Sequence, residues 1–351
     1  MDIFKFMREH DHEQLVFGYE PSSGYRGLIA IHNTTLGPAL GGTRYWKYAS
    51  EQDAVVDALR LAKGMTYKAA VAGLSLGGGK SVIMIPEGPV DREAIFRAHG
   101  RMVESLRGRY ITAEDVGTSP VDMDYIHLET DHVVGLQGRS GDPSPVTAHG
   151  VYMGMKASAK WKFGSDDLAD RTVAVQGCGH VGYYLCKNLA AEGARLIVTD
   201  IAKDKVERVV EECGATAVAS EAIYGQDAEI FAPCALGATV NDKTLAQFKV
   251  KIIAGGANNV LAEPRHGDAL EKQGILYAPD YVINAGGLIN VNSELENWSA
   301  ERAHAKAGDI YDTMLRVYQL AKDEGLPTYQ AADRLAEKRI AMAAKLKRTW
   351  V

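Results

Sequence analysis

The stretch that decides the fold is RTVAVQGCGHVG, residues 171 to 182. Its first half is apolar and β-prone, and its second half has the glycine spacing GxGxxG. A helical stretch follows as far as Glu192, then a stop at Gly193 and a second apolar strand that ends in Asp200. A GxGxxG alone is a weak signal. Strand, glycine turn, helix, strand and an acid about 20 residues further on together predict a complete dinucleotide-binding unit.

Each part of the turn has a physical role. The turn consists of Gly177, Cys178, Gly179, His180, Val181 and Gly182. The first glycine makes the tight turn, the second lets the backbone approach a pyrophosphate, and the third allows the helix to pack closely. Asp200 is expected to accept hydrogen bonds from the adenosine ribose and to repel a 2′-phosphate, and the nearby cations are Lys203 and Lys205. The sequence therefore predicts NAD rather than NADP.

Composition limits the class of protein. The chain has 351 residues, of which 46% are hydrophobic and 24% charged, so it can form two domains. Its net charge of -6 argues against binding to nucleic acid. It contains no apolar run of about 20 residues that could span a membrane. Residues 1 to 13 mix acids and bases without an apolar core, so they do not read as a secretory signal, and we expect a cytoplasmic protein.

The four cysteines show neither a CxxC motif nor Cys/His spacing. We therefore expect reduced thiols and no metal site. Cys178 could be a redox switch, but its place inside the glycine turn favours a role in packing.

A second informative stretch, LGGGK from Leu76 to Lys80, stands in the first half of the chain, with Lys80 twelve residues after Lys68. Three glycines leave backbone uncovered, which predicts a loop built around Lys80 that another group can approach closely. Burial and a neighbouring cation, for which Lys68 is the candidate, would lower the pKa of Lys80 and make it a base. A P-loop is excluded because residue 74 is leucine, whereas a lysine that extends from a turn into solvent stays open.

The pattern along the chain predicts an α/β fold with two domains. The first, residues 1 to 140, is expected to hold the catalytic and oligomerisation functions, and residues 141 to 325 the Rossmann-type NAD-binding fold. A glycine-rich hinge at 135 to 144 would separate them at a cleft. A final helix within 326 to 351 is expected to pack back on the first domain. Expected strands are 25–32, 81–85, 109–112, 228–232 and 251–254, and expected helices are 91–106, 144–163, 203–212, 300–324 and one that begins at Ser50.

Several segments, in order along nearly the whole chain, resemble the leucine, valine and phenylalanine dehydrogenase branch of the amino-acid dehydrogenases. Glutamate dehydrogenases are more distant relatives of this branch. Besides the glycine turn, the segments are LGPALGGTR (36–44), KGMTYK (63–68), LGGGK (76–80), TAEDVGT (112–118), PSPVTAHG (143–150), APCALG (232–237) and PDYVINAGGLIN (279–290).

The resemblance implies reversible oxidative deamination, in which an L-amino acid, water and NAD+ give a 2-oxo acid, ammonium and NADH. It also implies a homo-oligomer. By this resemblance Lys80 activates water, Asp115 shuttles protons to and from the amino group, and Lys68 holds the substrate carboxylate. On the cofactor side it implies roles for Thr147, Ala235, Asn259 and Asn284, with Ile201 beside Asp200. The chemistry agrees, because hydride transfer from an amine carbon needs a base and a proton carrier. A solvated loop acid or a helix cap remains the alternative for Asp115.

The side-chain pocket that the resemblance implies is apolar. Its residues are Leu40, Gly41, Met65, Ala113, Leu288 and Val291. Such a pocket disfavours glutamate, because nothing in it offsets the desolvation of a γ-carboxylate. We expect leucine first, then valine and isoleucine, with an aromatic amino acid as the alternative and a non-catalytic NAD-binding sensor as a different class. The chain departs from the leucine enzymes near this pocket, at Asn292, Ser293, Glu294 and Trp298.

Overall fold

The computed structural model describes residues 2–139 and 141–347. It divides the chain into two compact units. Unit 1 comprises Met1–Gly141, Val291–Asn297 and Ala336–Val351, and unit 2 comprises Asp142–Asn290 and Trp298–Leu335. The structure thus differs from the expected domain limits at three places, the first of which is Gly141, the last residue of the first segment of unit 1. Residues 291–297 lie in unit 1 although they fall within 141–325, and residues 326–335 lie in unit 2. The last four residues of the expected 326–351 segment lie outside the described residues.

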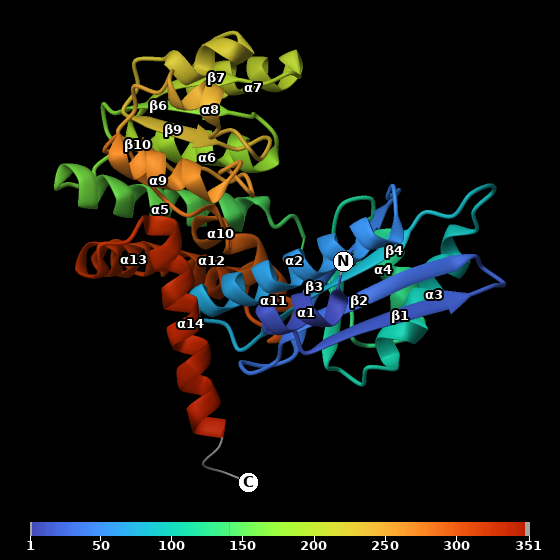
Figure 1. The fold of residues 1–351 in the computed structure, drawn as a ribbon. Helices are drawn as coiled ribbons and strands as arrows, with labels where there is room; N and C mark the ends of the chain where they lie inside the picture. The colour runs from blue at the N-terminus through green and yellow to red at the C-terminus, as the bar shows by residue number, and fades with distance from the viewer. Residues whose placement is uncertain (1, 140, 348–351) are drawn as a thin grey trace. The chain divides into compact units, whose positions relative to one another are not determined.

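Unit 1 is built on a five-stranded sheet with the order β1-β2-β4-β3-β5 (Figure 1). Strands β3, β4 and β5 are parallel to one another, and β1 and β2 are antiparallel to their neighbours. The elements are α1 (Ile3–Glu9), β1 (Gln14–Glu20), β2 (Tyr25–Asn33), β3 (Ala39–Trp46), α2 (Glu51–Val71), β4 (Gly77–Met84), α3 (Arg92–Glu104), β5 (Tyr110–Glu114) and α4 (Pro120–His127).

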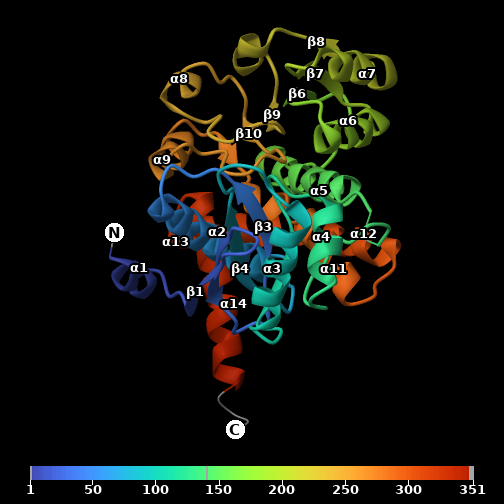
Figure 2. The ribbon, with the colours of Figure 1, turned by 90° about the vertical axis from the view of Figure 1, so that its right-hand side faces the viewer.

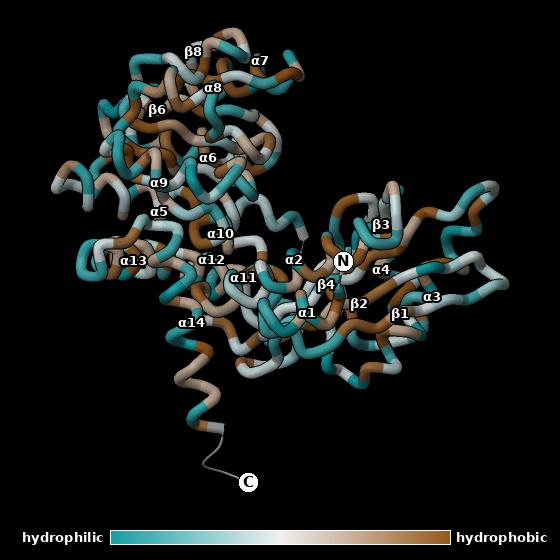
Figure 3. Tube along the Cα trace, viewed as in Figure 1, coloured by the Kyte–Doolittle hydropathy of each residue, from teal (hydrophilic) through white to brown (hydrophobic). Residues whose placement is uncertain are grey.

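The central strands of this sheet are apolar on both faces, and β2 is drawn mostly in the hydrophobic colour in Figure 3. Side chains alternate between the faces of a strand. Accordingly, Leu28 and Ala30 pack with the buried alanines of α2, whereas Ile29 and Ile31 pack with Val103 of α3. The sheet is thus covered by α2 on one face and by α3 on the other. Helix α2 begins as expected at Ser50, whose side chain accepts a hydrogen bond from the Asp53 backbone N–H.

Unit 2 contains a six-stranded parallel sheet with the order β11-β10-β9-β6-β7-β8 (Figure 2). This is the doubly wound dinucleotide-binding topology that the sequence predicts. Its elements and connections are α5 (Ser144–Phe163), β6 (Thr172–Gln176), α6 (His180–Glu192), β7 (Arg195–Thr199), α7 (Lys203–Cys213), β8 (Thr216–Ala217), a 3-10 turn (Ser220–Gly225), β9 (Ile230–Pro233), α8 (Asp242–Leu245), β10 (Ile252–Ile253), α9 (Pro264–Lys272), β11 (Leu276–Tyr277), α10 (Asp280–Ile283), α12 (Ala300–Gly308) and α13 (Ile310–Glu324).

Two helices cross the division between the units. Helix α11 (Gly286–Leu295) begins in unit 2 and ends in unit 1, and so does α14 (Thr328–Lys347). The single helix expected at 300–324 is two helices, because the chain turns at Asp309. The Asp309 backbone N–H bonds to the Lys306 carbonyl three residues back, directly after Gly308, a poor helix former. Within the described residues, no helix is long and apolar enough to cross a membrane.

The LGGGK stretch is not a loop. Gly77, Gly78, Gly79 and Lys80 are the first four residues of strand β4. The glycines are required because protein backbone fills the space that their side chains would need. A Cβ at Gly77 would lie 2.0 Å from the Asn33 carbonyl oxygen, and one at Gly78 would lie 2.1 Å from the Thr66 backbone nitrogen. The expectation of an open loop is therefore wrong, and what approaches the glycines closely is α2 and the neighbouring strands.

Candidate functional site

Lys80 and Asp115 form an ion pair in unit 1. The Nζ of Lys80 donates to Oδ2 of Asp115 at 2.6 Å, and Lys80 is only 5% exposed. Lys80 extends from the middle of β4, and Asp115 directly follows β5. The sequence prediction placed both groups in the catalytic machinery, and the structure places them in contact. The solvent-exposed lysine that the sequence left open is excluded, and Asp115 is an ion-paired acid rather than a solvated one.

The three parallel strands explain this meeting. Ala30 and Lys80 are paired across β2 and β4, and Ala30 belongs to the face of the sheet that packs on α2. Because side chains of directly paired residues point to the same face of a sheet, Lys80 lies on this face too. Strand β3 lies between β4 and β5 in the sheet, so a side chain from β3 can reach both. Arg44 of β3 reaches the residue after β5, because its Nε donates to the same Oδ2 of Asp115 at 3.1 Å.

The electrostatics suit proton transfer. Burial lowers the pKa of Lys80 below its ordinary value, and the charge of Arg44 acts in the same direction, whereas Asp115 opposes the change. Burial alone would raise the pKa of Asp115, but attraction to Lys80 and Arg44 outweighs it, and the net pKa of Asp115 is lowered. At neutral pH Asp115 is therefore a carboxylate. The lowered pKa of Lys80 makes its neutral amine form easier to reach near neutral pH.

Arg44 and its second partner, Asp57, were missed by the sequence analysis. The Nη1 of Arg44 donates to Oδ2 of Asp57, on α2, at 2.7 Å. Arg44 ends the quoted segment LGPALGGTR, but nothing in the segment shows that its guanidinium points to Asp115, 71 residues away. The cation that the structure places beside the Lys80–Asp115 pair is thus Arg44. Lys68, the candidate cation from the sequence, lies on α2 three residues after Met65.

The residues of unit 1 that the sequence predicts for the substrate pocket come from three elements. Leu40 and Gly41 are in β3, Ala113 is in β5, and Met65 is in α2. Leu40 and Ala113 are buried, and Met65 is partly buried. Gly41 is required by packing, because a Cβ there would lie 1.8 Å from the Gly79 carbonyl oxygen. Its own carbonyl accepts a hydrogen bond from the Tyr110 hydroxyl at 2.6 Å.

Leu288 and Val291 lie three residues apart on α11, so they share one face of that helix. Leu288 is buried within unit 2, whereas Val291 belongs to unit 1. Of the departures in the same helix, Glu294 has a structural task in unit 1, because its Oε2 accepts a hydrogen bond from the Gly135 backbone N–H at 3.1 Å. Trp298, in unit 2, lies against the guanidinium of Arg302.

The glycine turn of unit 2 has the geometry of a phosphate cradle. Gly177 has φ +102°, and a Cβ there would lie 2.8 Å from the Ala235 Cβ. A Cβ at Gly182 would lie 1.9 Å from the Gly177 carbonyl oxygen, so the third glycine serves close packing. A Cβ at Gly179 would meet nothing within 4 Å. The backbone at Gly179 therefore borders open space at the start of α6, where a pyrophosphate fits.

The Asp200 carboxylate holds the turn. Its Oδ2 accepts a hydrogen bond from the Cys178 backbone N–H at 2.7 Å, and its Oδ1 accepts one from Ala202 at 2.9 Å. Each oxygen has a further lone pair for a ribose hydroxyl. Ile201 beside it is 95% exposed. The Cys178 thiol is buried, and burial raises its pKa to about 12, which favours the packing role over a redox switch.

His180, the first residue of α6, is exposed, and its Nδ1 lies 3.2 Å from Oδ2 of Asp142. Val181, which follows it, contributes the side chain nearest to Gly256, where a Cβ would lie 2.8 Å from the Val181 Cγ1. Val181 therefore packs against the loop at Gly256, whereas His180 lies at the surface of the turn.

A second polar group in unit 2 fits a nicotinamide amide. Asn284 is buried, and its Nδ2 donates to Oδ1 of Asn258 at 2.7 Å. Among the residues that the structure describes, its Oδ1 is one of five buried side-chain polar atoms without a hydrogen-bond partner. Such an orphaned acceptor suits an incoming N–H donor. Thr147 lies beside Gly287, three residues after Asn284 in the chain, because a Cβ at Gly287 would be 3.1 Å from the Thr147 Oγ1.

The other two predicted cofactor residues lie on loops of unit 2. Asn259 has φ +53°, and its carbonyl accepts a hydrogen bond from the Ala238 backbone N–H at 2.6 Å. Ala235 is exposed beside Gly177. Both positions follow strands of the parallel sheet, β9 in the case of Ala235 and β10 in the case of Asn259.

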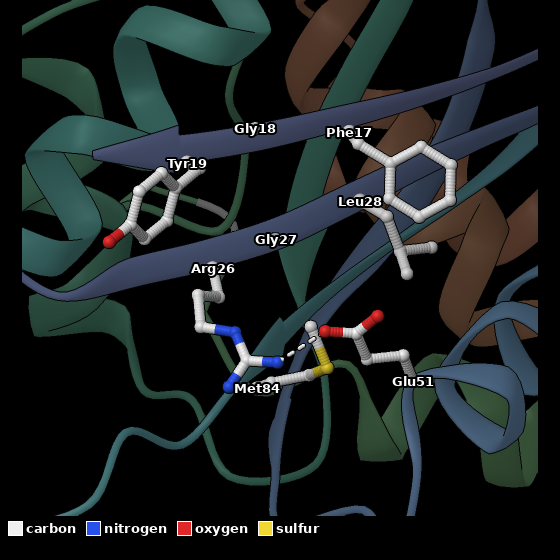
Figure 4. A pocket seen from close by; sticks show the side chains of 8 residues that line it. All are labelled: Phe17, Gly18, Tyr19, Arg26, Gly27, Leu28, Glu51 and Met84. Atoms are coloured by element: carbon white, nitrogen blue, oxygen red, sulfur yellow. Dashed lines mark hydrogen bonds and ion pairs between the residues drawn. The ribbon is translucent and has the colours of Figure 1, made fainter. Parts of the chain in front are cut away.

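A separate pocket on unit 1 does not coincide with the predicted site (Figure 4). It lies over the β1–β2 hairpin, where the Arg26–Glu51 ion pair crosses it. None of the predicted site residues lines it. Its lining is Phe17, Gly18, Tyr19, Arg26, Gly27, Leu28, Glu51 and Met84.

Comparison with known proteins agrees with this geometry. Residues 12–132 match the family model of the Glu/Leu/Phe/Val dehydrogenase dimerisation domain, and residues 196–348 match that of the glutamate/leucine/phenylalanine/valine dehydrogenases. The leucine dehydrogenase of Bacillus cereus is 58% identical over all of this chain and 97% of its own length. That of Bacillus subtilis is 59% identical over 97% of this chain and 94% of its own length.

Among solved structures, the L-tryptophan dehydrogenase of Nostoc punctiforme superposes with a TM-score of 0.90 at 45% identity, over 97% of this chain and 99% of its own. The fold and the site define a two-domain amino-acid dehydrogenase, and the chain belongs to the Glu/Leu/Phe/Val dehydrogenase family. The resemblance inferred from the sequence motifs is thereby confirmed.

Proposed function

We propose that the protein catalyses the NAD-dependent, reversible oxidative deamination of branched-chain L-amino acids, with leucine preferred. The observation that carries this proposal is the buried Lys80–Asp115 pair at 2.6 Å. A base with a lowered pKa beside an ionised carboxylate provides what the reaction needs. A non-catalytic sensor would have no use for such a pair, since burying a lysine costs stability.

The residues divide the proton chemistry as follows. NAD+, when bound, supplies the hydride acceptor. The Asp115 carboxylate takes a proton from the substrate ammonium, so that the amine nitrogen is neutral when the hydride leaves the α-carbon. Neutral Lys80 then takes a proton from water as its oxygen adds to the imine carbon. Asp115 returns its proton to the nitrogen. The C–N bond then breaks as the hydroxyl loses its proton to form the 2-oxo group, the departing ammonia takes up that proton as ammonium, and Lys80 releases its own proton to solvent. Lys68 is proposed to hold the substrate α-carboxylate.

The choice of NAD over NADP is supported by unit 2. The Asp200 carboxylate, with its two backbone hydrogen bonds, would lie beside the 2′-position of a bound adenosine and would repel a phosphate there. The open backbone at Gly179 suits the pyrophosphate, and the orphaned Oδ1 of Asn284 suits the nicotinamide amide. Thr147, Ala235, Asn259 and Ile201 are proposed to complete the cofactor contacts.

Substrate preference is supported by the apolar residues Leu40, Met65, Ala113, Leu288 and Val291. A pocket of this kind has no group to offset the desolvation of a glutamate side chain. The relatives at 58% and 59% identity are leucine dehydrogenases, whereas the tryptophan dehydrogenase is 45% identical. One methylene in an apolar pocket is worth only about 1–3 kcal/mol, so valine and isoleucine should also react. An aromatic amino acid is the second candidate.

We also propose a homo-oligomer that works in the cytoplasm. The matched family model of residues 12–132 describes a dimerisation domain. Phe17 and Tyr19 of the edge strand β1 are exposed, as expected of a face that meets another subunit. The four cysteines are thiols, which suits a reducing compartment. Light scattering on the purified protein measures the subunit number.

The test is NADH formation by the purified protein with NAD+ and, in turn, leucine, valine, isoleucine, phenylalanine, tryptophan and glutamate, repeated with NADP+. We expect the highest kcat/KM with leucine, lower values with valine and isoleucine, and at least about a tenfold preference for NAD+, the equivalent of one ionic hydrogen bond. Reaction with the aromatic amino acids alone would retain the mechanism and refute the pocket assignment. No reaction with any of the six would refute the proposed function.

A further inference from the structure

Arg44 is held rigidly between two carboxylates of unit 1. Its Nε donates to Asp115 at 3.1 Å, and its Nη1 donates to Asp57 at 2.7 Å. The Tyr48 hydroxyl donates to the same oxygen of Asp57, Oδ2, so this acid is itself held in place. The planar guanidinium therefore has both ends fixed, one by α2 and one by the loop after β5.

The two cations share one oxygen of Asp115. Both the Nζ of Lys80 and the Nε of Arg44 donate to Oδ2, so neither of them occupies Oδ1. The backbone at Asp115 is also fixed, because its N–H donates to Thr118 Oγ1 at 2.8 Å and that hydroxyl donates to the Thr43 carbonyl. With the backbone and one oxygen held, the direction of the other oxygen is determined. A proton shuttle requires such a fixed direction.

The charges around Lys80 are balanced. Asp115 and Asp57 face it with negative charge, from the loop after β5 and from α2, and Arg44 faces it with positive charge from β3. Removal of Arg44 would leave two acids beside one lysine and so favour the charged form of Lys80. Removal of the charge of Asp57 would have the opposite effect. The two residues therefore act on Lys80 with opposite sign, although they are hydrogen-bonded partners.

We propose that Arg44, anchored by Asp57, is a positioning residue for the deamination. It fixes the Asp115 carboxylate so that Oδ1 receives the substrate proton, and its charge keeps Lys80 available as a neutral base. Arg44 itself is not assigned to the substrate carboxylate, because its Nε and Nη1 are occupied by the two acids. This proposal rests on the proposed roles of Lys80 and Asp115.

The experiment compares wild type with Arg44→Gln, Arg44→Lys and Asp57→Asn. The control is Arg26→Gln, which removes an ion pair with Glu51 on another strand of the same sheet. For each protein, kcat and KM for leucine are measured with saturating NAD+ from about pH 7 to about pH 11, the range over which a lysine of lowered pKa titrates. NADH affinity and the melting temperature report whether the variants fold and bind cofactor.

We expect Arg44→Gln to lower kcat at pH 8 at least about tenfold and to move the rising limb of the pH profile about one pH unit or more toward alkaline pH, since one unit is tenfold in the neutral lysine. Asp57→Asn should move the limb toward acid pH. Arg44→Lys should restore the position of the limb without restoring kcat, because it keeps the charge but not the planar fork. The control should match wild type.

Three outcomes would overturn the proposal. The first is a wild-type pH profile and kcat in Arg44→Gln. The second is a loss of kcat in both variants with no movement of the limb, which marks a merely structural role. The third is movement of the limb in the same direction in both. The proposed function is tested separately from the Arg44 and Asp57 variants, by the turnover of leucine in the wild type and by the loss of that turnover in Lys80→Ala.

A readout that needs no turnover completes the design. Trace acetylation of Lys80 by acetic anhydride, followed against pH by mass spectrometry, measures its titration in each folded variant. We expect the acetylation midpoints to follow the order predicted for the pH profiles of kcat, with the lowest midpoint in Asp57→Asn and the highest in Arg44→Gln. An unchanged midpoint in Arg44→Gln contradicts the proposal even if the protein oxidises no amino acid.

Discussion

At the residue scale, the proposed chemistry of this protein depends on one carboxylate oxygen. Oδ2 of Asp115 accepts hydrogen bonds from Lys80 and from Arg44. Burial disfavours the ammonium form of Lys80, whereas the ion pair with Asp115 stabilises it. Because the two effects oppose each other, the lysine can both gain and lose a proton. A lysine on the surface would stay protonated at neutral pH and could not act as a base.

The first prediction concerns Lys80 itself. Lys80→Ala should lower kcat for leucine by about 10²–10⁴-fold, the usual contribution of a general base, because no other amine takes its place. NADH affinity, measured by fluorescence titration, should change little, since the dinucleotide turn belongs to unit 2. Lys5→Ala, at an exposed position in α1, is the control. Retention of more than a tenth of the wild-type kcat would contradict the assignment of Lys80 as base.

At the scale of elements, the glycine triplet is what allows β4 to carry Lys80 beneath α2. A Cβ at Gly78 would lie 2.1 Å from the backbone nitrogen and 2.3 Å from the Oγ1 of Thr66. A Cβ at Gly79 would lie 2.7 Å from the Tyr110 ring. Helix and strand thus touch backbone to backbone. This contact fixes the distance between β4 and the helix that carries Met65, Lys68 and Asp57.

The second prediction tests this packing. Gly78→Ala should destabilise the protein by about 2 kcal/mol or more, because the clash is with backbone that cannot move aside. Gly64→Ala is the matched control within α2, where a Cβ meets nothing within 4 Å. It should be neutral or stabilising by up to about 1 kcal/mol, from helix propensity. Urea unfolding of unit 1, followed by its own spectroscopic signal, measures both, and equal effects in the two variants would refute the packing argument.

At the scale of the whole molecule, both units contain histidines that burial keeps neutral. Burial lowers the pKa of His99 to about 3 and that of His32 to about 4 in unit 1. In unit 2, burial lowers the pKa of His149 to about 4, assisted by His304, which stacks on it. Each of these histidines gains a proton more easily when the chain unfolds, because its ordinary pKa is near 6.5. Below that pH the unfolded state therefore binds more protons.

The third prediction follows from this sign. Each histidine contributes stability that is complete above about pH 6.5 and that is lost as the pH falls toward the folded pKa. At pH 5 the loss is about 2 kcal/mol per histidine, from 1.36 kcal/mol per pH unit. The melting temperature should therefore fall between pH 7 and pH 5, measured by calorimetry. His32→Gln should reduce this fall and the exposed His127→Gln should not; an equal fall in all three proteins would exclude His32 as a cause.

Several features were accessible from the sequence because their signals are local. The dinucleotide fold follows from the strand, glycine turn, helix and Asp200 within 30 residues, and the helix limits at Ser50, Gly164 and Gly193 follow from capping chemistry. The resemblance predicted separate catalytic roles for Lys80 and Asp115, but their ion pair was not predicted, because Lys80 lies on β4 and Asp115 directly follows β5, and only the sheet brings these strands together. Two predicted elements were wrong, the LGGGK loop and the unbroken 300–324 helix. In both, a glycine is compatible with more than one local structure: a loop or a closely packed strand in the first, and a helix interior or a turn in the second.

The sequence by itself determined the class of fold and the family, and it indicated the proposed base and proton carrier, because these depend on short motifs. Only the tertiary structure decided that the glycine triplet lies inside a strand, that α11 and α14 each belong partly to both units, and that Arg44 joins Asp115 to Asp57. Arg44 and Asp115 are 71 residues apart. They meet because β3 and β5 are parallel neighbours, and no local pattern encodes which strands of a sheet lie side by side.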